Sequence, residues 1–219
     1  MKSSEHVLLV AGGKGLRMQS ETPKQFMLLA GTPVLLRCLE AFYAYSPIIN
    51  IIVVLPQEHI AYWQELCRTY NCTIEHTIVA GGVERFYSVQ AGLAHIDANG
   101  FVAIHDGVRP FVSQACIARG FACARQNGSA VPVVDSIDSL RIVDGQTSKI
   151  IDRTTIKRVQ TPQIFTVEKL KQAYRQQYSP AFTDDASVWE SAGFTVALYE
   201  GEERNIKITT QADLERIAL

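Results

Sequence analysis

Short runs of β-branched and apolar residues alternate with longer segments of helical period along most of the chain, and no other feature restricts its fold as strongly. Four such runs span residues 6–11, 50–55, 73–79 and 101–105. This alternation predicts an α/β protein with a mostly parallel sheet, helices on both faces and ligands at the carboxyl ends of the strands. A chain of 219 residues, 47% of them hydrophobic, can bury one sizeable core, so we expect a single domain over residues 1–219.

The remaining elements are predicted from helical period and turn signals. Thr32-Pro33 indicates the start of a helix that ends at Ser46-Pro47. Helices are also expected over residues 84–97, 113–126, 167–178 and 184–192 and from Gln211, and strands over residues 195–199 and 206–209. The alternation breaks after residue 134, and residues 138–159 are predicted to form short strands around the turn at Asp144-Gly145. We interpret this stretch, at about residues 136–160, as an inserted β arm.

Charge and apolar patterning restrict the partners of the chain. It carries 21 basic and 22 acidic residues, so no global field favours nucleic acid or an anionic membrane. No apolar run approaches the roughly 20 residues needed to cross a bilayer, and no secretory leader is recognisable. Five scattered cysteines show no metal-binding spacing. We therefore expect a cytoplasmic protein that binds neither nucleic acid nor membrane.

The first apolar run leads into a glycine-rich loop, Ala11-Gly12-Gly13-Lys14-Gly15-Leu16-Arg17-Met18. Glycines let backbone N–H groups approach phosphate oxygens closely, which favours a phosphate-binding loop. Met18 stands where the Rossmann pattern needs glycine, and the Gly-Lys-Ser/Thr of the P-loop is missing. Arg17 and Lys24 instead place two cations beside the glycines, as charge stabilisation in nucleotidyl transfer requires. The alternative is a surface turn with solvated charges.

A second group of polar residues follows the run at 101–105. Asp106 offers the hard oxygen ligand that Mg²⁺ prefers, and Arg109 could hold a substrate phosphate. Alternatively, Asp106 caps the turn and pairs with Arg109. His105 is a weaker candidate, because a single histidine at a strand end is more often packed than catalytic. A further glycine turn at Gly81-Gly82 leads to Ser88 and could frame a nucleotide base, although it could also be a plain connector.

Taken in order, these segments resemble the 2-C-methyl-D-erythritol 4-phosphate cytidylyltransferases of the non-mevalonate isoprenoid pathway over nearly the whole chain. The motifs that carry the resemblance are the glycine loop at 11–18, Pro23-Lys24-Gln25, Gly81-Gly82 with Arg85 and Ser88, His105-Asp106-Gly107-Val108-Arg109-Pro110, Thr161-Pro162-Gln163, Thr183-Asp184-Asp185-Ala186-Ser187 and Asn205-Ile206-Lys207. The resemblance implies a Rossmann-like fold of the nucleotide-diphospho-sugar transferase type.

The resemblance also implies roles for individual residues. Arg17 and Lys24 would stabilise the transition state at the α-phosphate of CTP, Asp106 would bind Mg²⁺, and Lys207 would bind phosphate and orient the attacking group. The residues that would surround CTP are Ala11, Gly12, Gly13, Gly15, Gly82 and Ser88. The second substrate would lie near Arg109, Ser136 and Thr161. The β arm would swap across a homodimer and carry Arg153 into the partner's active site, whereas without the resemblance Arg153 reads as a solvated charge.

Three positions depart from the usual pattern of the family. Ser136 replaces a threonine and keeps a hydroxyl, Val83 stands where a polar residue is often found near the base, and Arg204 stands where some members have an acidic residue. The implied reaction is transfer of CMP from CTP to methylerythritol phosphate without a covalent intermediate. Two alternatives stay open: a ribitol-5-phosphate cytidylyltransferase, which differs in the acceptor, and a regulatory protein that binds nucleotide without catalysis.

Overall fold

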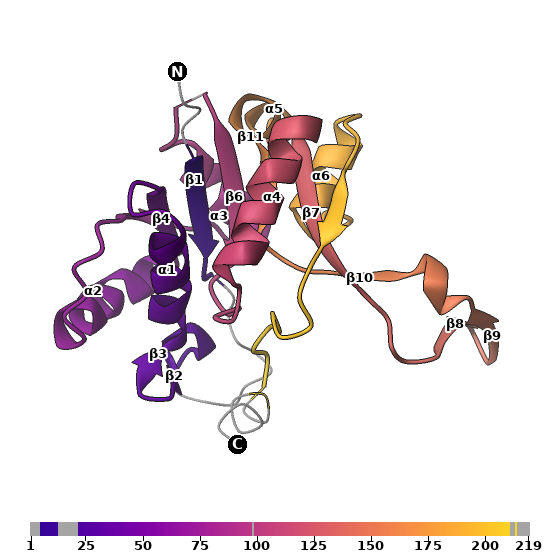
Figure 1. Ribbon diagram of the computed structural model, residues 1–219, viewed down its shortest axis with the longest axis horizontal. Helices are drawn as coiled ribbons and strands as arrows, with labels where there is room; N and C mark the ends of the chain where they lie inside the picture. Colours follow the sequence, from indigo (N-terminus) through magenta and orange to yellow (C-terminus); the bar gives the residue numbers. More distant parts are fainter. Residues whose placement is uncertain (1–4, 13–21, 98, 211–212, 214–219) are drawn as a thin grey trace.

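The computed structural model describes residues 5–12, 22–97, 99–210 and 213, and its centre is an eight-stranded mixed sheet (Figure 1). The strands lie in the order β10-β7-β11-β6-β1-β4-β5, and β12 pairs with β7. Their bounds are β1 Glu5–Val10, β4 Asn50–Leu55, β5 Thr77–Ala80, β6 Phe101–Asp106, β7 Ser129–Asp135, β10 Lys157–Val159, β11 Gln163–Thr166 and β12 Leu198–Glu200.

The parallel part of the sheet sets where the functional residues lie. β1 pairs in parallel with β4 on one side and β6 on the other, and Val10 lies opposite both Val54 and Asp106. The carboxyl ends of these strands therefore meet at one edge, where the strand-to-helix loops also gather. The antiparallel β11 inserts between β6 and β7, so the sheet is mixed rather than wholly parallel.

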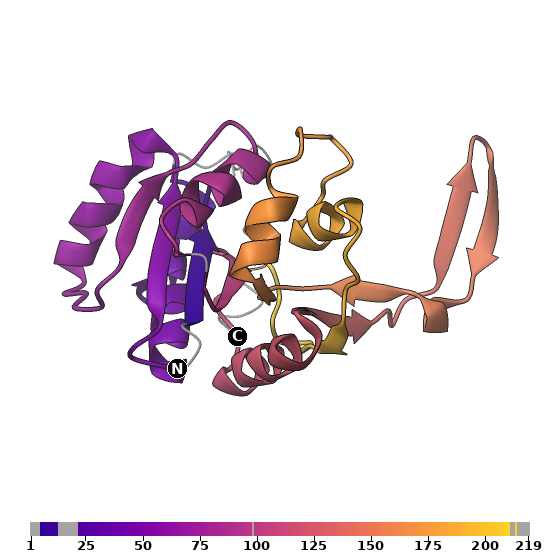
Figure 2. The same ribbon diagram turned by 90° about the horizontal axis from the view of Figure 1, so that it is seen from above.

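Helices cover both faces of the sheet, as Figure 2 shows from above. The helices are α1 Val34–Tyr45, α2 Ile60–Thr69, α3 Arg85–Leu93, α4 Gln114–Asn127, α5 Val167–Ala173 and α6 Asp185–Ser191, with 3-10 helices η1 Lys24–Phe26, η2 Gln57–His59 and η3 Arg153–Thr155. Alternate residues of β1 face opposite sides: Val7 and Leu9 pack with α1 and α4, whereas Leu8 and Val10 pack with α3, α5 and α6. Short β2 (Leu28–Leu29) and β3 (Thr32–Pro33) pair with each other before α1.

The predicted β arm is a hairpin that projects away from the body of the molecule (Figures 1 and 2). Its strands β8 (Leu140–Asp144) and β9 (Thr147–Ile151) pair around the predicted turn, where Gly145 has a φ of 57°. Ile142, Val143 and Ile150 are largely exposed on it. The end of the predicted arm, β10, instead pairs with β7 in the central sheet, so the projecting hairpin is shorter than the arm expected from the sequence.

Most predicted elements are present, but several differ in extent, including the shorter helices α3 and α5, and one predicted strand is absent. The strand expected over 73–79 begins only at Thr77, because the chain first closes a turn after α2 in which Cys72 N–H donates to the Cys67 carbonyl at 2.8 Å. The strand expected over 195–199 is β12, shifted towards Glu200. The strand expected over 206–209 is wrong: this segment contacts a loop, with Ile208 N–H donating to the Val108 carbonyl. The final helix predicted from Gln211 lies outside the described residues, apart from position 213.

Sequence patterns did not predict α2 or the strand β11. Within the described part of the chain, no helix is long and apolar enough to cross a membrane.

Candidate active site

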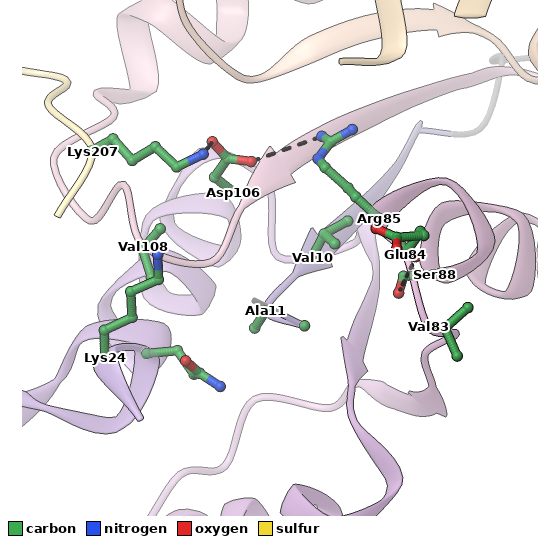
Figure 3. Close-up of a pocket in the computed structure, with 12 residues that line it drawn as sticks. Val10, Ala11, Lys24, Val83, Glu84, Arg85, Ser88, Asp106, Val108 and Lys207 are labelled. Atoms are coloured by element: carbon green, nitrogen blue, oxygen red, sulfur yellow. Dashed lines mark hydrogen bonds and ion pairs between the residues drawn. The ribbon is translucent and has the colours of Figure 1, made fainter. Parts of the chain in front are cut away.

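A cavity of about 500 Å³ opens at the carboxyl edge of β1 and β6 (Figure 3). The glycine loop, the segment after Pro23, the turn before α3 and the end of β6 contribute its walls. The lining residues are Val10, Ala11, Gly12, Lys24, Gln25, Val83, Glu84, Arg85, Ser88, Asp106, Val108 and Lys207. Residues from five separate motifs of the sequence therefore line one space.

Asp106 ends β6, and three cations surround its carboxylate. Lys207 Nζ lies 3.0 Å from Oδ2, Arg109 Nε lies 3.3 Å from Oδ2, and an Arg85 terminal nitrogen lies 3.8 Å from Oδ1. Figure 3 shows Lys207 and Arg85 approaching from opposite sides. Burial alone would raise the pKa of Asp106, but the charges of Arg85, Lys207 and Arg109 outweigh it and hold the pKa well below its usual range. Asp106 is thus an anion within a cationic site.

The packing of Phe26, two positions after Lys24, places Lys24 in the cavity. Phe26, 2% exposed, contacts the rings of His59, Tyr62 and Trp63 at centroid distances of 5.6, 5.1 and 6.3 Å. This aromatic cluster fixes η1, the short helix that carries Lys24. Gly13, Gly15 and Arg17 of the predicted loop lie outside the described residues, whereas Ala11 and Gly12 line the cavity.

The turn at Gly81-Gly82 is held by Ser88. Gly82 N–H donates to Ser88 Oγ at 3.2 Å, and Ser88 Oγ–H can donate to the Glu84 carbonyl at 3.2 Å. A Cβ on Gly82 would lie 2.3 Å from the Cβ of Tyr87, so this approach requires glycine. Ser88 therefore shapes the turn as well as lining the cavity.

A second cavity of about 330 Å³ adjoins the first. It is lined by Arg85, Asp106, Arg109, Val159, Gln160, Thr161, Gln163, Thr183, Asp184 and Lys207, so it shares Arg85, Asp106 and Lys207 with the first cavity. Two of the predicted acceptor residues, Arg109 and Thr161, lie in it.

Thr161 and His105 support Asp106 from behind. Asp106 N–H donates to Thr161 Oγ1 at 3.1 Å, and Thr161 Oγ1 lies 3.0 Å from His105 Nδ1. The other ring nitrogen of His105 lies 3.0 Å from the Arg109 carbonyl. These contacts are consistent with a neutral ring that accepts at Nδ1 and donates at Nε2. Burial lowers the pKa of His105 to about 4, so His105 packs as a neutral group and the sequence-based preference for that role is consistent with the geometry.

The loop before Lys207 is anchored to the same sheet edge. Asn205 Nδ2 donates to the Thr161 carbonyl at 2.8 Å, and Arg109 donates to the Asn205 carbonyl at 2.8 Å. Arg204, one of the departures from the family pattern, has a side chain that is 68% exposed and lies 3.4 Å from Glu202. Asn205 therefore orients the segment that carries Lys207, while Arg204 faces the surface.

Ser136 and Arg153 lie together, apart from both cavities. They line a hollow of about 440 Å³ at the base of the hairpin, and Arg153 donates to the Ile137 carbonyl at 2.6 Å. The structure therefore places Ser136 with Arg153 and not with Arg109 and Thr161, with which the sequence analysis grouped it. Arg85 lines both cavities; no role for it was predicted from the sequence, although its position just after the glycine turn pointed to the cavity.

Asp106 fits a magnesium ion that is held mainly by phosphates and water. No cluster of three or more His, Cys, Asp or Glu side chains suited to a metal occurs among the described residues. Mg²⁺ typically takes one or two carboxylates together with substrate phosphates. Oδ1 of Asp106 meets only the more distant Arg85 among the ion pairs of the described chain, which leaves that oxygen suitable for a metal.

A mixed sheet flanked by helices, with a cavity beside the start of the glycine loop, an acidic strand end and converging cations, is the arrangement of a nucleotidyltransferase. Residues 5–218 match the family model described as 2-C-methyl-D-erythritol 4-phosphate cytidylyltransferase, and the chain belongs to this family. Proteins of that name from Bacteroides thetaiotaomicron and Phocaeicola vulgatus are 50% and 48% identical to it, over 98% and 97% of this chain and 97% of each relative.

Solved structures agree with this membership. The 4-diphosphocytidyl-2C-methyl-D-erythritol synthase of Anaerococcus prevotii superposes with a TM-score of 0.83 at 26% identity, over 98% of this chain and 94% of that one. The 2-C-methyl-D-erythritol 4-phosphate cytidylyltransferase of Thermus thermophilus gives a TM-score of 0.78 at 30% identity, over 99% and 97% of the two chains. The predicted fold class and family are thereby confirmed.

Proposed function

We propose that this protein transfers CMP from CTP to 2-C-methyl-D-erythritol 4-phosphate, releasing pyrophosphate and forming 4-diphosphocytidyl-2-C-methyl-D-erythritol for isoprenoid biosynthesis. The observation that carries the proposal is the meeting of two cavities at Arg85, Asp106 and Lys207 in a chain of this family. CTP fits the larger cavity, which Ala11 and Gly12 border, and the acceptor phosphate fits the smaller cavity beside Arg109. The two reacting groups then meet at the shared residues.

The charges at the junction suit an attack by one phosphate on another. Negative charge grows on the α-phosphoryl group during transfer, and preorganised cations stabilise it. Lys24 and Lys207 supply such cations from the cavity walls, and we assign Arg17 to the same role from the resemblance. A phosphate monoester with a second pKa of about 6 is largely ionised near neutral pH, so the acceptor needs no general base. The neutral, packed state of His105 agrees with this.

Mg²⁺ belongs to the proposal as the ion that Asp106 would hold. When bound, it would neutralise charge on the triphosphate and the leaving pyrophosphate. Thr161 and His105 keep Asp106 in place, while Lys207 and Arg109 balance its charge. The cytoplasmic location expected from the sequence stays a prediction.

We also propose that the active site is completed in a homodimer by Arg153 of the hairpin. Within one chain, Arg153 and Ser136 line a hollow that includes none of Arg85, Asp106 and Lys207, and the hairpin exposes apolar side chains such as Ile142 and Ile150. Mixing inactive Arg153→Ala and Lys207→Ala proteins tests this proposal. Each hybrid dimer should contain one complete site and so regain up to about half of the activity of a wild-type dimer, and no recovery after confirmed subunit exchange would refute the shared site.

The acceptor is tested by a competition. CTP, Mg²⁺ and equal concentrations of methylerythritol phosphate and ribitol 5-phosphate are incubated with the protein, and both products are separated and quantified. Family membership leads us to expect mainly the methylerythritol product. Preferential turnover of ribitol phosphate would overturn the assignment of the acceptor, and the absence of any pyrophosphate release would favour the non-catalytic alternative.

A further inference from the structure

Arg85 occupies the boundary between the two cavities. It is the first residue of α3, follows the glycine turn and lines both spaces. The α-phosphate of one substrate and the phosphate of the other must come within bonding distance for transfer, so the reacting atoms lie where the cavities meet. A guanidinium at that boundary is placed to contact both phosphoryl groups.

The guanidinium of Arg85 is held from outside the cavities by a buried carboxylate. Its terminal nitrogen lies 2.6 Å from Asp185 Oδ2 but 3.8 Å from Asp106 Oδ1. Asp185 is fully buried, and its other oxygen accepts a 2.6 Å hydrogen bond from the hydroxyl of Tyr174. Each carboxylate oxygen of Asp185 therefore has one short partner, and the stronger partner of Arg85 is Asp185 rather than Asp106.

The carboxylate of Asp185 is itself fixed by neighbouring elements. Asp185 begins α6, whose capping box joins Asp184 and Ser187. Gln163 of β11 spans this helix start, because its Oε1 accepts from Ala186 N–H at 2.9 Å and its Nε2 donates to Asp184 at 2.8 Å. The ring of Tyr174 stacks on Phe86 with a centroid distance of 4.8 Å. The start of α6 and the ring of Tyr174, which together support Arg85, are thus held by contacts within the protein.

Asp185 is the nearer partner of Arg85 and limits how closely the guanidinium approaches Asp106. A guanidinium with no other partner would close on the Asp106 carboxylate or reach towards solvent, because opposite charges a few ångströms apart attract strongly at a partly buried site. Side chains that contact a ligand are commonly oriented by a second hydrogen-bonded group, and removing that group reduces activity without removing the contact residue.

We propose that Asp185, together with Tyr174, is a positioning pair that keeps the Arg85 guanidinium at the junction of the two cavities, where Arg85 contacts the phosphoryl groups as they react. This inference rests on the proposed function. It adds Arg85 to the residues that touch substrate and gives Asp185 and Tyr174 a role in the rate of transfer, distinct from a purely structural link between α3 and α6.

The first test separates turnover from substrate binding. Asp185→Asn keeps the shape of the side chain but removes its charge, and Tyr174→Phe keeps the stacked ring but removes the hydroxyl. We expect Asp185→Asn to lower kcat by about tenfold with KM for CTP changed by less than about threefold, and Tyr174→Phe to lower kcat by a smaller factor. Glu65→Gln is the matched control, because Glu65 forms a 2.5 Å pair with Arg68 on the exposed surface of α2; its kcat should equal that of the wild type.

The second test uses chemical rescue. Arg85→Ala should lose about 100-fold in kcat, and added guanidinium ion should restore about tenfold of that loss by binding against Asp185. The double variant Arg85→Ala, Asp185→Asn should respond by less than about twofold, since the anion that would hold the guanidinium is gone. Urea, a neutral molecule of the same shape, and the wild-type protein with guanidinium serve as controls.

These experiments distinguish an error in the positioning role of Asp185 and Tyr174 from an error in the proposed function. If the wild-type protein turns over CTP with methylerythritol phosphate while Asp185→Asn and Tyr174→Phe both keep wild-type kcat, the positioning pair is wrong and the proposed function stands. Equal rescue of the single and double variants by guanidinium would also overturn the positioning role of Asp185. If Asp185→Asn does not fold, as judged by circular dichroism, Tyr174→Phe and the rescue of Arg85→Ala decide the question. Failure of the wild-type protein to react would instead refute the proposed function.

Discussion

Replacing Phe26 with alanine should damage the active site through packing alone. Phe26 is 2% exposed and its ring contacts His59, Tyr62 and Trp63. Phenylalanine-to-alanine changes in cores cost about 3–5 kcal/mol of unfolding free energy, and small domains are stable by about 5–15 kcal/mol. The variant should therefore fold with a lower urea midpoint. Because Phe26 ends the short helix that carries Lys24, a displacement of about 1 Å in that lysine should reduce kcat by up to about 100-fold.

Phe121→Ala is the matched control for this prediction. Phe121 is fully buried and stacks on Tyr45 at 5.6 Å, but it lies in α4 and lines neither cavity. Urea unfolding followed by circular dichroism should show a similar loss of stability in both variants, and a pyrophosphate-release assay under folding conditions should show reduced kcat in Phe26→Ala alone. Equal kcat values in the two variants would refute the claim that the aromatic cluster positions Lys24.

Three further outcomes are expected. Gly82→Ala should raise KM for CTP by about tenfold in steady-state assays, because its new Cβ would meet the Cβ of Tyr87 at 2.3 Å; an unchanged KM would contradict this. Lys207→Gln should lower kcat by about 100-fold while circular dichroism stays unchanged, because one cation at the reacting phosphates is lost. Burial lowers the pKa of His105 to about 4 in the folded chain, whereas a histidine in the unfolded chain has a pKa near 6.5. Between these two values the unfolded chain is protonated at this residue and the folded chain is not. The contribution of His105 to the free energy of unfolding is therefore complete above about pH 6.5 and is lost as the pH falls towards 4. The loss between pH 7 and pH 5 is about 2 kcal/mol. Urea titrations with a chelator present should show a shallower pH dependence for His105→Gln, and parallel curves would contradict the neutral assignment.

The parallel core of the fold could be predicted because its strands are buried on both faces. β1, β4 and β6 each contain a run of at least four consecutive apolar residues, and each was expected within one residue of its bounds. β11 could not be found in the same way, since its four residues Gln163–Thr166 are polar at both ends. Gln163 is buried there because it binds the start of α6, a tertiary contact that leaves no local signal. The strand predicted over 206–209 was wrong because a local apolar signal did not reflect pairing in the sheet: Ile208 packs in a small cluster with Leu29, Val34 and Val108 instead.

In the candidate site, too, residues in local motifs could be predicted from the sequence, whereas contacts between distant residues could not. Ala11 and Gly12 follow β1 and Asp106 ends β6, so the parallel pairing of these two strands brings them to one sheet edge. The pairing of Arg85 with Asp185 joins residues 100 positions apart, and no periodicity predicts it. The sequence likewise could not show that Ser136 lies at the base of the hairpin with Arg153, because that placement depends on the direction in which the hairpin leaves the sheet.

In the proposed reaction the two cavities hold both substrates at once, and the acceptor phosphate attacks the α-phosphorus of CTP directly at Arg85, Asp106 and Lys207. The most direct test is the stereochemical course of the reaction with one isomer of the CTP analogue that carries sulfur on the α-phosphate. A single in-line displacement predicts inversion of configuration at that phosphorus in the isolated product. Retention of configuration would show two successive displacements through an enzyme-bound intermediate and would contradict the claim.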